Sequence, residues 1–213
     1  DGMLYITTGD ATERALAQEK NSLAGKILRI NDDGSIPADN PFPGNPIWTW
    51  GHRNPQGIAW HPETGKLYAT EHGPSTFDGP PGGDEINRIV KGGNYGWPLV
   101  SHERRRAGTV APLQIFTPAE APSGAAFYSG EKLPQFKNNF FFGALRGEGL
   151  VRVVFDANDP DKIALVEKLR EVQFGRIREV AEGPDGALYF STSNSNAGPG
   201  QTPVDKIFRL RAK

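Results

Sequence analysis

Four arginine residues stand in connecting segments of this 213-residue chain, where they could bind a ligand that carries several negative charges. Arg53 is followed by Asn54, Arg146 comes directly after an apolar run, and Arg176 and Arg178 precede another. Guanidinium groups bind planar carboxylates through two parallel hydrogen bonds. Four such groups on one face would suit a planar polyanion. The alternative is that each arginine pairs with a nearby carboxylate.

The segment Glu71-His72-Gly73-Pro74 offers ligands for a hard cation. It begins where an expected strand ends, and Asp84-Glu85 opens the next strand. Carboxylates, and backbone carbonyls left unpaired at Gly and Pro, are oxygen ligands of the kind that Ca²⁺ prefers. The alternative is a structural Gly-Pro turn, in which His72 is a hydrogen-bonded loop residue. His52 could either position Arg53 or pack in the interior.

The elements that must position these residues are β-strands. Short apolar segments alternate with period two between Gly, Pro, Asn and Asp, and the helical signal is confined to 13–20. Four kinds of strand recur in a fixed order. The first kind is expected at 57–61, 124–128 and 177–181. The second, which follows a turn, is expected at 1–7, 65–70, 139–144 and 185–192, the third at 26–31, 85–90, 150–155 and 206–210, and the fourth at 47–50, 113–116 and 163–166.

This order predicts an all-β protein, a β-propeller built of four-stranded antiparallel blades. The chain begins at the second strand of one blade and ends at the third strand of another, with two complete blades between. We therefore expect residues 1–213 to form a single-domain partial propeller of about four blades, with N-terminal blades missing. A β-sandwich is the alternative, but it does not explain the repeated order. In a propeller, the connections that carry Arg53, Gly73, Arg146 and Arg176 share one face.

Composition excludes several classes of protein. The net charge is −1, and the one basic run, within His102-Glu103-Arg104-Arg105-Arg106, is interpreted as a solvated loop, so no nucleic-acid-binding surface is expected. The chain has no cysteine, which excludes disulfides and thiolate metal sites. No apolar run is long enough to span a bilayer, and no signal peptide is visible.

Several motifs resemble the soluble quinoprotein glucose dehydrogenase and aldose sugar dehydrogenase family. The longest are Gly51-His52-Arg53-Asn54-Pro55-Gln56-Gly57 and Lys91-Gly92-Gly93-Asn94-Tyr95-Gly96-Trp97-Pro98. The others are Glu71-His72-Gly73-Pro74, Asp84-Glu85-Ile86-Asn87, Ala121-Pro122-Ser123-Gly124 and Arg176-Ile177-Arg178, in the family's order over essentially the whole chain. The resemblance implies a six-bladed propeller that binds pyrroloquinoline quinone (PQQ) and Ca²⁺ on one face.

The resemblance also implies roles for individual residues. Arg53, the expected catalytic residue, and Asn54 would contact the quinone near its reactive carbonyl. The carbonyls of Gly73 and Pro74 would hold the Ca²⁺ that binds the cofactor. A further, structural Ca²⁺ would be bound at the positions of Glu85 and Tyr95.

Other positions match the family less closely. Arg176 and Arg178 match a pair that binds cofactor carboxylates, whereas Arg146 stands where some members have Lys, which keeps the charge but changes the geometry. Gln18 is a candidate cofactor-loop residue. Thr117 stands where glucose dehydrogenases carry a stacking Trp, which favours the aldose sugar dehydrogenase branch. The family's general-base His precedes the Asp1-Gly2 turn, so we expect it upstream and expect this fragment alone to be inactive.

The implied reaction is PQQ-dependent oxidation of the anomeric C1 hydroxyl of an aldose to the lactone, with hydride transfer to PQQ assisted by Ca²⁺. An external electron acceptor and a periplasmic or secreted location are also implied. Two alternatives stay open. A calcium-dependent lactone hydrolase on a propeller would need a metal on the axis with side-chain carboxylate ligands. A non-catalytic binding propeller of the same lineage would take up no cofactor.

Overall fold

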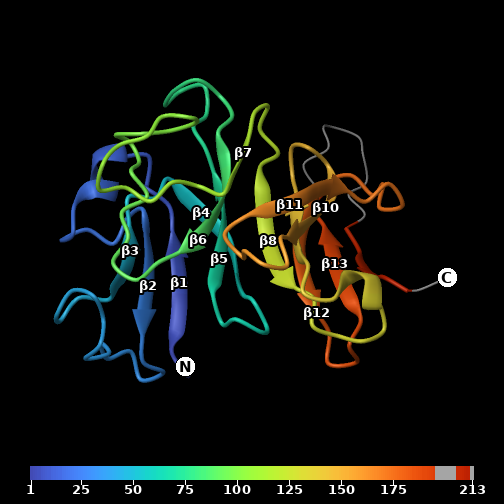
Figure 1. Cartoon of the computed structure of the whole chain (residues 1–213). Helices are drawn as coiled ribbons and strands as arrows, with labels where there is room; N and C mark the ends of the chain where they lie inside the picture. The colour runs from blue at the N-terminus through green and yellow to red at the C-terminus, as the bar shows by residue number, and fades with distance from the viewer. Residues whose placement is uncertain (195–204, 212–213) are drawn as a thin grey trace. The chain divides into compact units, whose positions relative to one another are not determined.

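The computed structural model describes residues 1–194 and 205–211 and places their strands in four antiparallel sheets (Figure 1). The first sheet has three strands and the next two have four each. Their order along the chain is β1 (Leu4–Thr8), β2 (Lys26–Ile30) and β3 (Ile47–Trp50), then β4 (Asn54–Trp60), β5 (Leu67–His72), β6 (Asp84–Ile89) and β7 (Gln114–Phe116), then β8 (Pro122–Phe127), β9 (Phe140–Ala144), β10 (Gly149–Phe155) and β11 (Ile163–Lys168).

The last sheet again has three strands, β12 (Ile177–Glu182), β13 (Leu188–Thr192) and β14 (Ile207–Arg209). Within every sheet, consecutive strands are neighbours, and the first and last sheets are each one strand short. The all-β class and the expected order of blades are therefore confirmed. Part of the expected connection 193–205 lies outside the described residues. Within the described part, no helix is long and apolar enough to cross a membrane.

Several expected strand boundaries were wrong. Asn54 and Pro122 were expected in connections but begin β4 and β8. Both are edge strands of their sheets. Pro55 and Pro122 have no N–H, and at an edge position this breaks no ladder hydrogen bond. Similarly, β5 runs on through His72, which was expected in a loop.

The helical signal at 13–20 corresponds to a single 3₁₀ helix, η1 (Arg14–Gln18), and a second short 3₁₀ helix, η2 (Pro134–Phe136), precedes β9. Buried Lys26 on β2 fixes η1. Its Nζ donates to the carbonyls of Leu16, Ala17 and Ala24 at 2.8, 3.1 and 2.6 Å. Burial lowers the pKa of Lys26 to about 8. The connection between β1 and β2 is therefore tied to the sheet by its own backbone.

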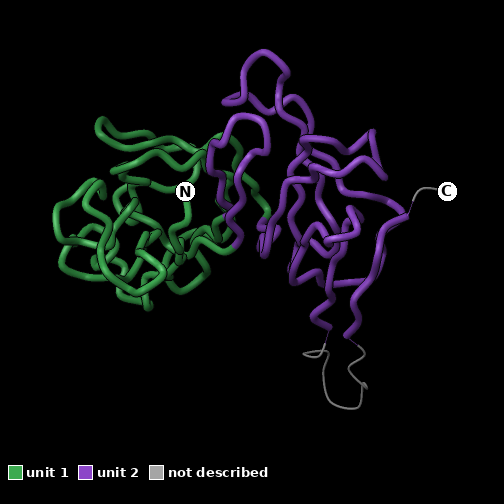
Figure 2. The backbone as a smooth tube through the Cα atoms, turned by 90° about the horizontal axis from the view of Figure 1, so that it is seen from below, with its two compact units in different colours: residues 1–56, 71–118 green, residues 57–70, 119–213 purple. Residues whose placement is uncertain are grey.

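The chain divides into two compact units (Figure 2). Unit 1 comprises residues 1–56 and 71–118, and unit 2 comprises residues 57–70 and 119–213. The division passes through β4 and β5. The expectation of a single domain over 1–213 stays a prediction.

The core of unit 2 is built on aromatic residues of β9. Phe140, Phe141 and Phe142 are all fully buried, because β9 lies inside its sheet and both of its faces are covered. Phe141 belongs to a cluster that includes Leu150 and Ile177. On the other face, Phe140 contacts Tyr68 and Phe127, with ring centroids 6.5 and 5.0 Å apart. Arg146 follows the end of β9 and Arg176 precedes the start of β12, so this packing lies next to both residues.

Candidate functional site

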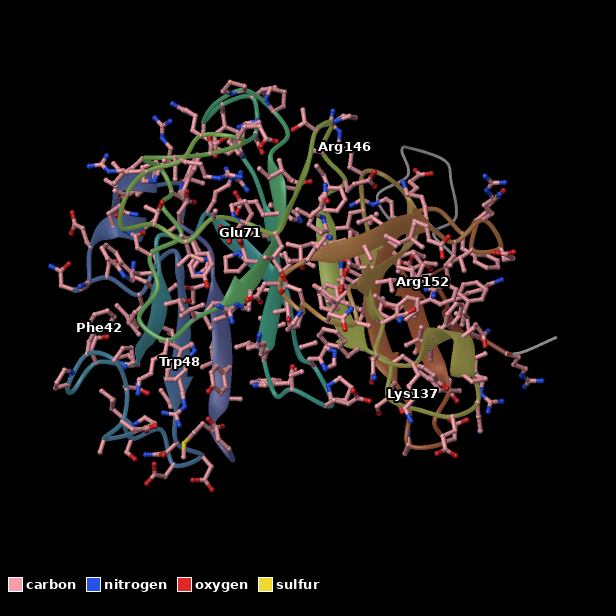
Figure 3. The ribbon with its side chains drawn as sticks, viewed as in Figure 1. Phe42, Trp48, Glu71, Lys137, Arg146 and Arg152 are labelled. Carbon is pink, nitrogen blue, oxygen red and sulfur yellow. The ribbon has the colours of Figure 1, made fainter. Side chains whose placement is uncertain are left out.

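Glu71 stands at the end of β5 in unit 1 (labelled in Figure 3), and its carboxylate fixes the backbone of Arg53. Glu71 is 4 % exposed. Its Oε1 accepts a hydrogen bond from the Arg53 backbone N at 2.6 Å, and its Oε2 lies 2.7 Å from His52 Nδ1. Asn87 on β6 donates from Nδ2 to the same Oε2 at 3.2 Å. One buried carboxylate therefore connects the end of β5 to β6 and to the entry of β4.

His52 packs in the interior. It is fully buried, its Nε2 lies 2.8 Å from Thr49 Oγ1, and its ring stacks on Tyr95 with centroids 4.4 Å apart. With both nitrogens engaged, its side chain has no free edge for a ligand. His52 thus acts on Arg53 only indirectly, because the two residues share Glu71.

The guanidinium of Arg53 is held by the connection between β5 and β6. Arg53 Nε donates to Asp78 Oδ2 at 3.1 Å and Nη2 donates to Ser75 Oγ at 3.1 Å. The Arg53 and Asp78 side chains are 12 % and 6 % exposed. The ion pair therefore lies largely out of water, where charge interactions are stronger than at the surface.

The far end of the same connection is also anchored. Gly83 N donates to Phe116 O at 2.9 Å and to Thr117 Oγ1 at 3.0 Å. Thr117, which the resemblance placed at the position of a stacking Trp, thus has a backbone-holding role here. At the near end, Gly73 N donates to Asp84 Oδ1 at 2.8 Å. The connection 73–83 is fixed at both ends and at Asp78.

A small cavity in unit 1 is lined by five of the residues predicted from sequence. They are Arg53, Gly73, Pro74, Glu85 and Tyr95. Its volume of about 10 Å³ accommodates roughly one water-sized sphere. The remaining lining residues are Glu71, His72, Gly83, Trp97, Val100 and Ser101.

Carboxyl groups are concentrated beside this cavity. Glu71 and Asp84 are buried and Glu85 is half-buried. Burial, and secondarily the charge of Glu71, raise the pKa of Glu85. Asn87 is fully buried and donates to both Glu71 and Glu85, which leaves its Oδ1 without a hydrogen-bond partner. Buried and half-buried carboxylates beside an amide oxygen without a hydrogen-bond partner are oxygen donors of the kind that suits Ca²⁺.

No cluster of three or more His, Cys, Asp or Glu arranged to hold a metal occurs among residues 1–194 and 205–211. A cation at the cavity would therefore depend in part on backbone carbonyls. Tyr95 fits this requirement through its backbone only. Its hydroxyl donates to Arg88 O at 2.5 Å and accepts from Val90 N at 2.9 Å.

Gln18 and Asn54 are placed differently from Arg53. The Gln18 amide pairs with Asn94 in both directions at 3.0 Å and donates to Trp97 O at 2.7 Å. It ties η1 to the segment 91–97, and one lone pair of its oxygen is left. The Asn54 side chain is half-buried and lies against Gly9, where an added Cβ would approach Asn54 Oδ1 to 3.0 Å.

In unit 2, Arg146 occupies the turn between β9 and β10 (Figure 3). Its backbone N and that of Gly147 both donate to Glu120 O at 3.0 Å. Lys168 Nζ donates to Glu120 Oε2 at 3.0 Å and to Gly147 O at 2.6 Å. The turn is thus held by backbone contacts and one ion pair. The Arg146 side chain is exposed and makes no hydrogen bond to a described residue.

Arg176 and Arg178 stand at the start of β12 and differ from each other. Arg176 Nε donates to Ser193 O at 2.9 Å and its Nη1 donates to Leu145 O at 3.3 Å. Its backbone N donates to Asn194 Oδ1 at 2.9 Å. Arg178 is exposed, with no hydrogen bond to any residue in the described ranges. Arg176 therefore braces two connections, and Arg178 is available to a ligand.

The sequence did not single out Asp78, Ser75 or Glu120, and it named Asn87 only as part of the motif Asp84-Glu85-Ile86-Asn87. Asp78 and Ser75 lie in an irregular connection, and Asp78 contacts Arg53 across 25 residues. Asn87 carried a signal, because it is a polar residue on the same side of β6 as Glu85, two positions away. Glu120 contacts Lys168 across 48 residues, which no local pattern reveals.

The chain is similar in sequence to known sugar dehydrogenases. The family model described as Glucose / Sorbosone dehydrogenase matches residues 1–199. The aldose sugar dehydrogenase YliI of Escherichia coli is 38 % identical over 213 residues, with 92 % of this chain and 55 % of that protein covered. The quinoprotein glucose dehydrogenase B of Acinetobacter calcoaceticus is 45 % identical over 130 residues, 51 % of this chain and 26 % of that protein.

Solved structures agree. An oxidoreductase of Thermus thermophilus described as a glucose dehydrogenase has a TM-score of 0.86 and 41 % identity over 98 % of this chain and 62 % of its own. The PQQ-bound aldose sugar dehydrogenase of Streptomyces coelicolor has a TM-score of 0.82 and 36 % identity, over 98 % of this chain and 58 % of its own. The chain spans about half the length of the curated relatives it matches.

Proposed function

We propose a function from one premise: the chain belongs to the glucose / sorbosone dehydrogenase family. The whole protein would be a PQQ-dependent dehydrogenase that oxidises the anomeric C1 hydroxyl of aldose sugars to the lactone. An external electron acceptor and a periplasmic or secreted location are part of the proposal. It is supported by similarity to a PQQ-bound aldose sugar dehydrogenase and to a quinoprotein glucose dehydrogenase.

The observation that carries the proposal is the convergence on one cavity. Arg53, Gly73 and Pro74 were assigned to the cofactor and its Ca²⁺ from the resemblance, and all three line the cavity of unit 1. Arg53 is separated from the other two by about 20 positions of chain. Their convergence is a property of the folded chain that the motifs do not impose.

The residues present fit a calcium ion. Gly73 and Pro74 would hold it through backbone carbonyls, and a second ion would take the carboxylate of Glu85 and the carbonyl of Tyr95. The partnerless Asn87 Oδ1 is an oxygen donor beside Glu71 and Glu85, and burial, followed by the charge of Glu71, raises the pKa of Glu85. A divalent cation there would favour ionised Glu85.

When bound, PQQ would supply the acceptor for the hydride that leaves C1, and Ca²⁺ would polarise it. The residues of this chain would bind PQQ and Ca²⁺ and orient the quinone. Arg53 presents positive charge where an oxyanion develops, which is the usual role of a fixed cation at such a site. Asn54 would contact the same region. Arg146, Arg176 and Arg178 would bind carboxylates, and Gln18 stays a candidate contact.

The experiment that tests the proposal uses the full-length protein reconstituted with PQQ and Ca²⁺. Aldose-dependent reduction of an artificial dye is expected, and it should disappear when the metal is chelated. PQQ uptake without dye reduction on any aldose would contradict the dehydrogenase assignment. Failure to take up PQQ would favour the binding propeller, and PQQ-independent lactone hydrolysis would favour the hydrolase.

A further inference from the structure

The guanidinium of Arg53 has two distinct hydrogen-bonding edges, and the protein occupies one of them. The side-on edge consists of Nε–H and the adjacent N–H of Nη2. Nε donates to Asp78 Oδ2 and Nη2 donates to Ser75 Oγ, both at 3.1 Å. The two contacts come from one connection, 73–83, and they match the fork geometry of this edge.

The end-on edge of the same guanidinium is available. It consists of one N–H of Nη1 and the second N–H of Nη2, and Nη1 donates to no residue of the described chain. Arg53 also lines the cavity that carries Gly73 and Pro74. A ligand with adjacent oxygens could therefore be bound by two parallel hydrogen bonds at this edge.

Asp78 is itself rigidly placed. Its Oδ1 accepts from Ser75 N, and its own backbone N donates to Ser75 O at 2.9 Å, which closes a tight turn. Arg14 Nη1 on η1 donates to Asp78 O at 2.9 Å. The Asp78 side chain is 6 % exposed, although the neighbouring Phe77 is 69 % exposed. The carboxylate therefore faces Arg53 and is largely shielded from water.

We infer that Asp78, assisted by Ser75, is the positioning residue for Arg53. By occupying the side-on edge, it fixes the rotation of the guanidinium and presents the end-on edge to the carbonyl or carboxylate oxygens of a planar ligand. That ligand is PQQ on the function proposed above, on which this inference rests. The gain is reduced loss of side-chain entropy on binding, because the flexible Arg53 is ordered beforehand.

The placement itself is testable without a cofactor. In the full-length protein, the Arg53 Nε–H proton should exchange slowly with solvent in ¹H–¹⁵N spectra, because it is hydrogen-bonded and poorly exposed. Asp78→Ala should accelerate this exchange about tenfold or more, as expected when a contact of about 1.4 kcal/mol is lost. Phe77→Ser, on the same turn, is the matched control and should leave it unchanged. Equal exchange in wild type and Asp78→Ala would overturn the inference.

The effect on the ligand is tested by titration with PQQ in the presence of Ca²⁺. Asp78→Ala should raise the Kd for PQQ about tenfold, which corresponds to about 1.4 kcal/mol. Asp78→Asn retains a hydrogen-bond acceptor for Nε–H and should restore most of the affinity. In an Arg53→Ala background, Asp78→Ala should cause no further loss, since Asp78 acts only through Arg53.

Two outcomes separate the inference from the proposed function. An equal loss of affinity in both backgrounds would assign Asp78 a general structural role and overturn the inference. If the wild-type protein takes up no PQQ, the proposed function fails, and the Nε–H measurement still decides whether Asp78 positions Arg53. If Asp78→Ala does not fold, Asp78→Asn is measured in its place. It should accelerate Nε–H exchange by less than about tenfold, because an amide oxygen accepts more weakly than a carboxylate. Equal exchange in wild type and Asp78→Asn would then overturn the inference.

Discussion

Arg53 in unit 1 and Arg146 in unit 2 are predicted to serve the same ligand, yet the protein holds them in different ways. Glu71 fixes the Arg53 backbone, and Asp78 and Ser75 fix its guanidinium. For Arg146, only the backbone is fixed, by the carbonyl of Glu120, and the side chain is exposed. A buried arginine must be paired within the protein, whereas an exposed arginine can remain unpaired until a ligand binds and orders it. The first arrangement favours precise charge placement and the second favours adjustable binding.

The largest expected effect comes from removing the carboxylate that fixes Arg53. Glu71→Ala would leave the donors of His52, Arg53 and Asn87 without an acceptor in a buried site. We expect a loss of about 3–5 kcal/mol in the free energy of unfolding, measured by urea titration of the full-length protein. The matched control is Glu63→Ala, which removes an exposed carboxylate bonded to Asn138 and should cost less than about 1 kcal/mol. Similar losses for both variants would contradict the role of Glu71.

The next effect compares the two arginines directly. Arg53→Ala should lower dye-reduction turnover by about 10²-fold or more, as for loss of an oxyanion donor. It should also destabilise the protein, because buried Asp78 loses its partner. Arg146→Ala should weaken PQQ binding but change the free energy of unfolding by no more than about 0.5 kcal/mol. Unchanged turnover in Arg53→Ala would remove it from the mechanism, and strong destabilisation by Arg146→Ala would erase the contrast.

A smaller effect concerns the close packing of backbone segments at Gly57 in unit 2. An added Cβ at Gly57 would lie 2.5 Å from Ala125 N and 2.6 Å from Ser123 O. Gly57→Ala should therefore cost about 1–3 kcal/mol of stability through overpacking, measured by thermal or urea unfolding. Gly65 has a φ of +65° but open space around its Cβ position. Gly65→Ala should cost about 1 kcal/mol through backbone strain alone. A neutral Gly57→Ala would show that the backbones can separate.

The smallest effect is a pH dependence within unit 2. Burial lowers the pKa of His61 below 6.5, and its Nδ1 accepts from Glu63 N at 3.2 Å. The unfolded chain therefore binds the proton more readily than the folded chain. Stability from neutral His61 is present above pH 6.5 and is lost as the pH falls through the folded pKa. Wild type should lose more stability between pH 7.5 and pH 5 than His61→Gln. Parallel losses would exclude His61 as the cause.

Much of the fold was predictable because its signals are local. Period-two apolar segments separated by turn residues gave the strand order, and the repeat gave the division into blades. The starts of β4 and β8 were placed too late, because Pro55 and Pro122 were read as loop residues. Only sheet order shows that they lie on edge strands, where proline is tolerated.

The candidate site was predictable in part. The motifs named Arg53, Gly73, Pro74, Glu85 and Tyr95, which line one cavity. The sequence left open whether His52 positions Arg53 or packs in the interior. In the structure His52 packs in the interior, in contact with Thr49, Glu71 and Tyr95. Nothing in the sequence indicated that the Tyr95 hydroxyl is already satisfied by backbone groups of Arg88 and Val90.

The sequence by itself determined which residue types are present at the ends of strands and in what order the strands follow one another. Only the tertiary structure decided which acidic residue meets which basic one. Glu71 reaches the Arg53 backbone across 18 residues and Asp78 reaches its guanidinium across 25. The Asp78 contact depends on the path of an irregular connection, which has no periodic pattern to reveal it, and the Glu71 contact depends on how the end of β5 meets the start of β4. Both contacts also depend on burial, because a carboxylate that is removed from water must be paired or hydrogen-bonded within the protein.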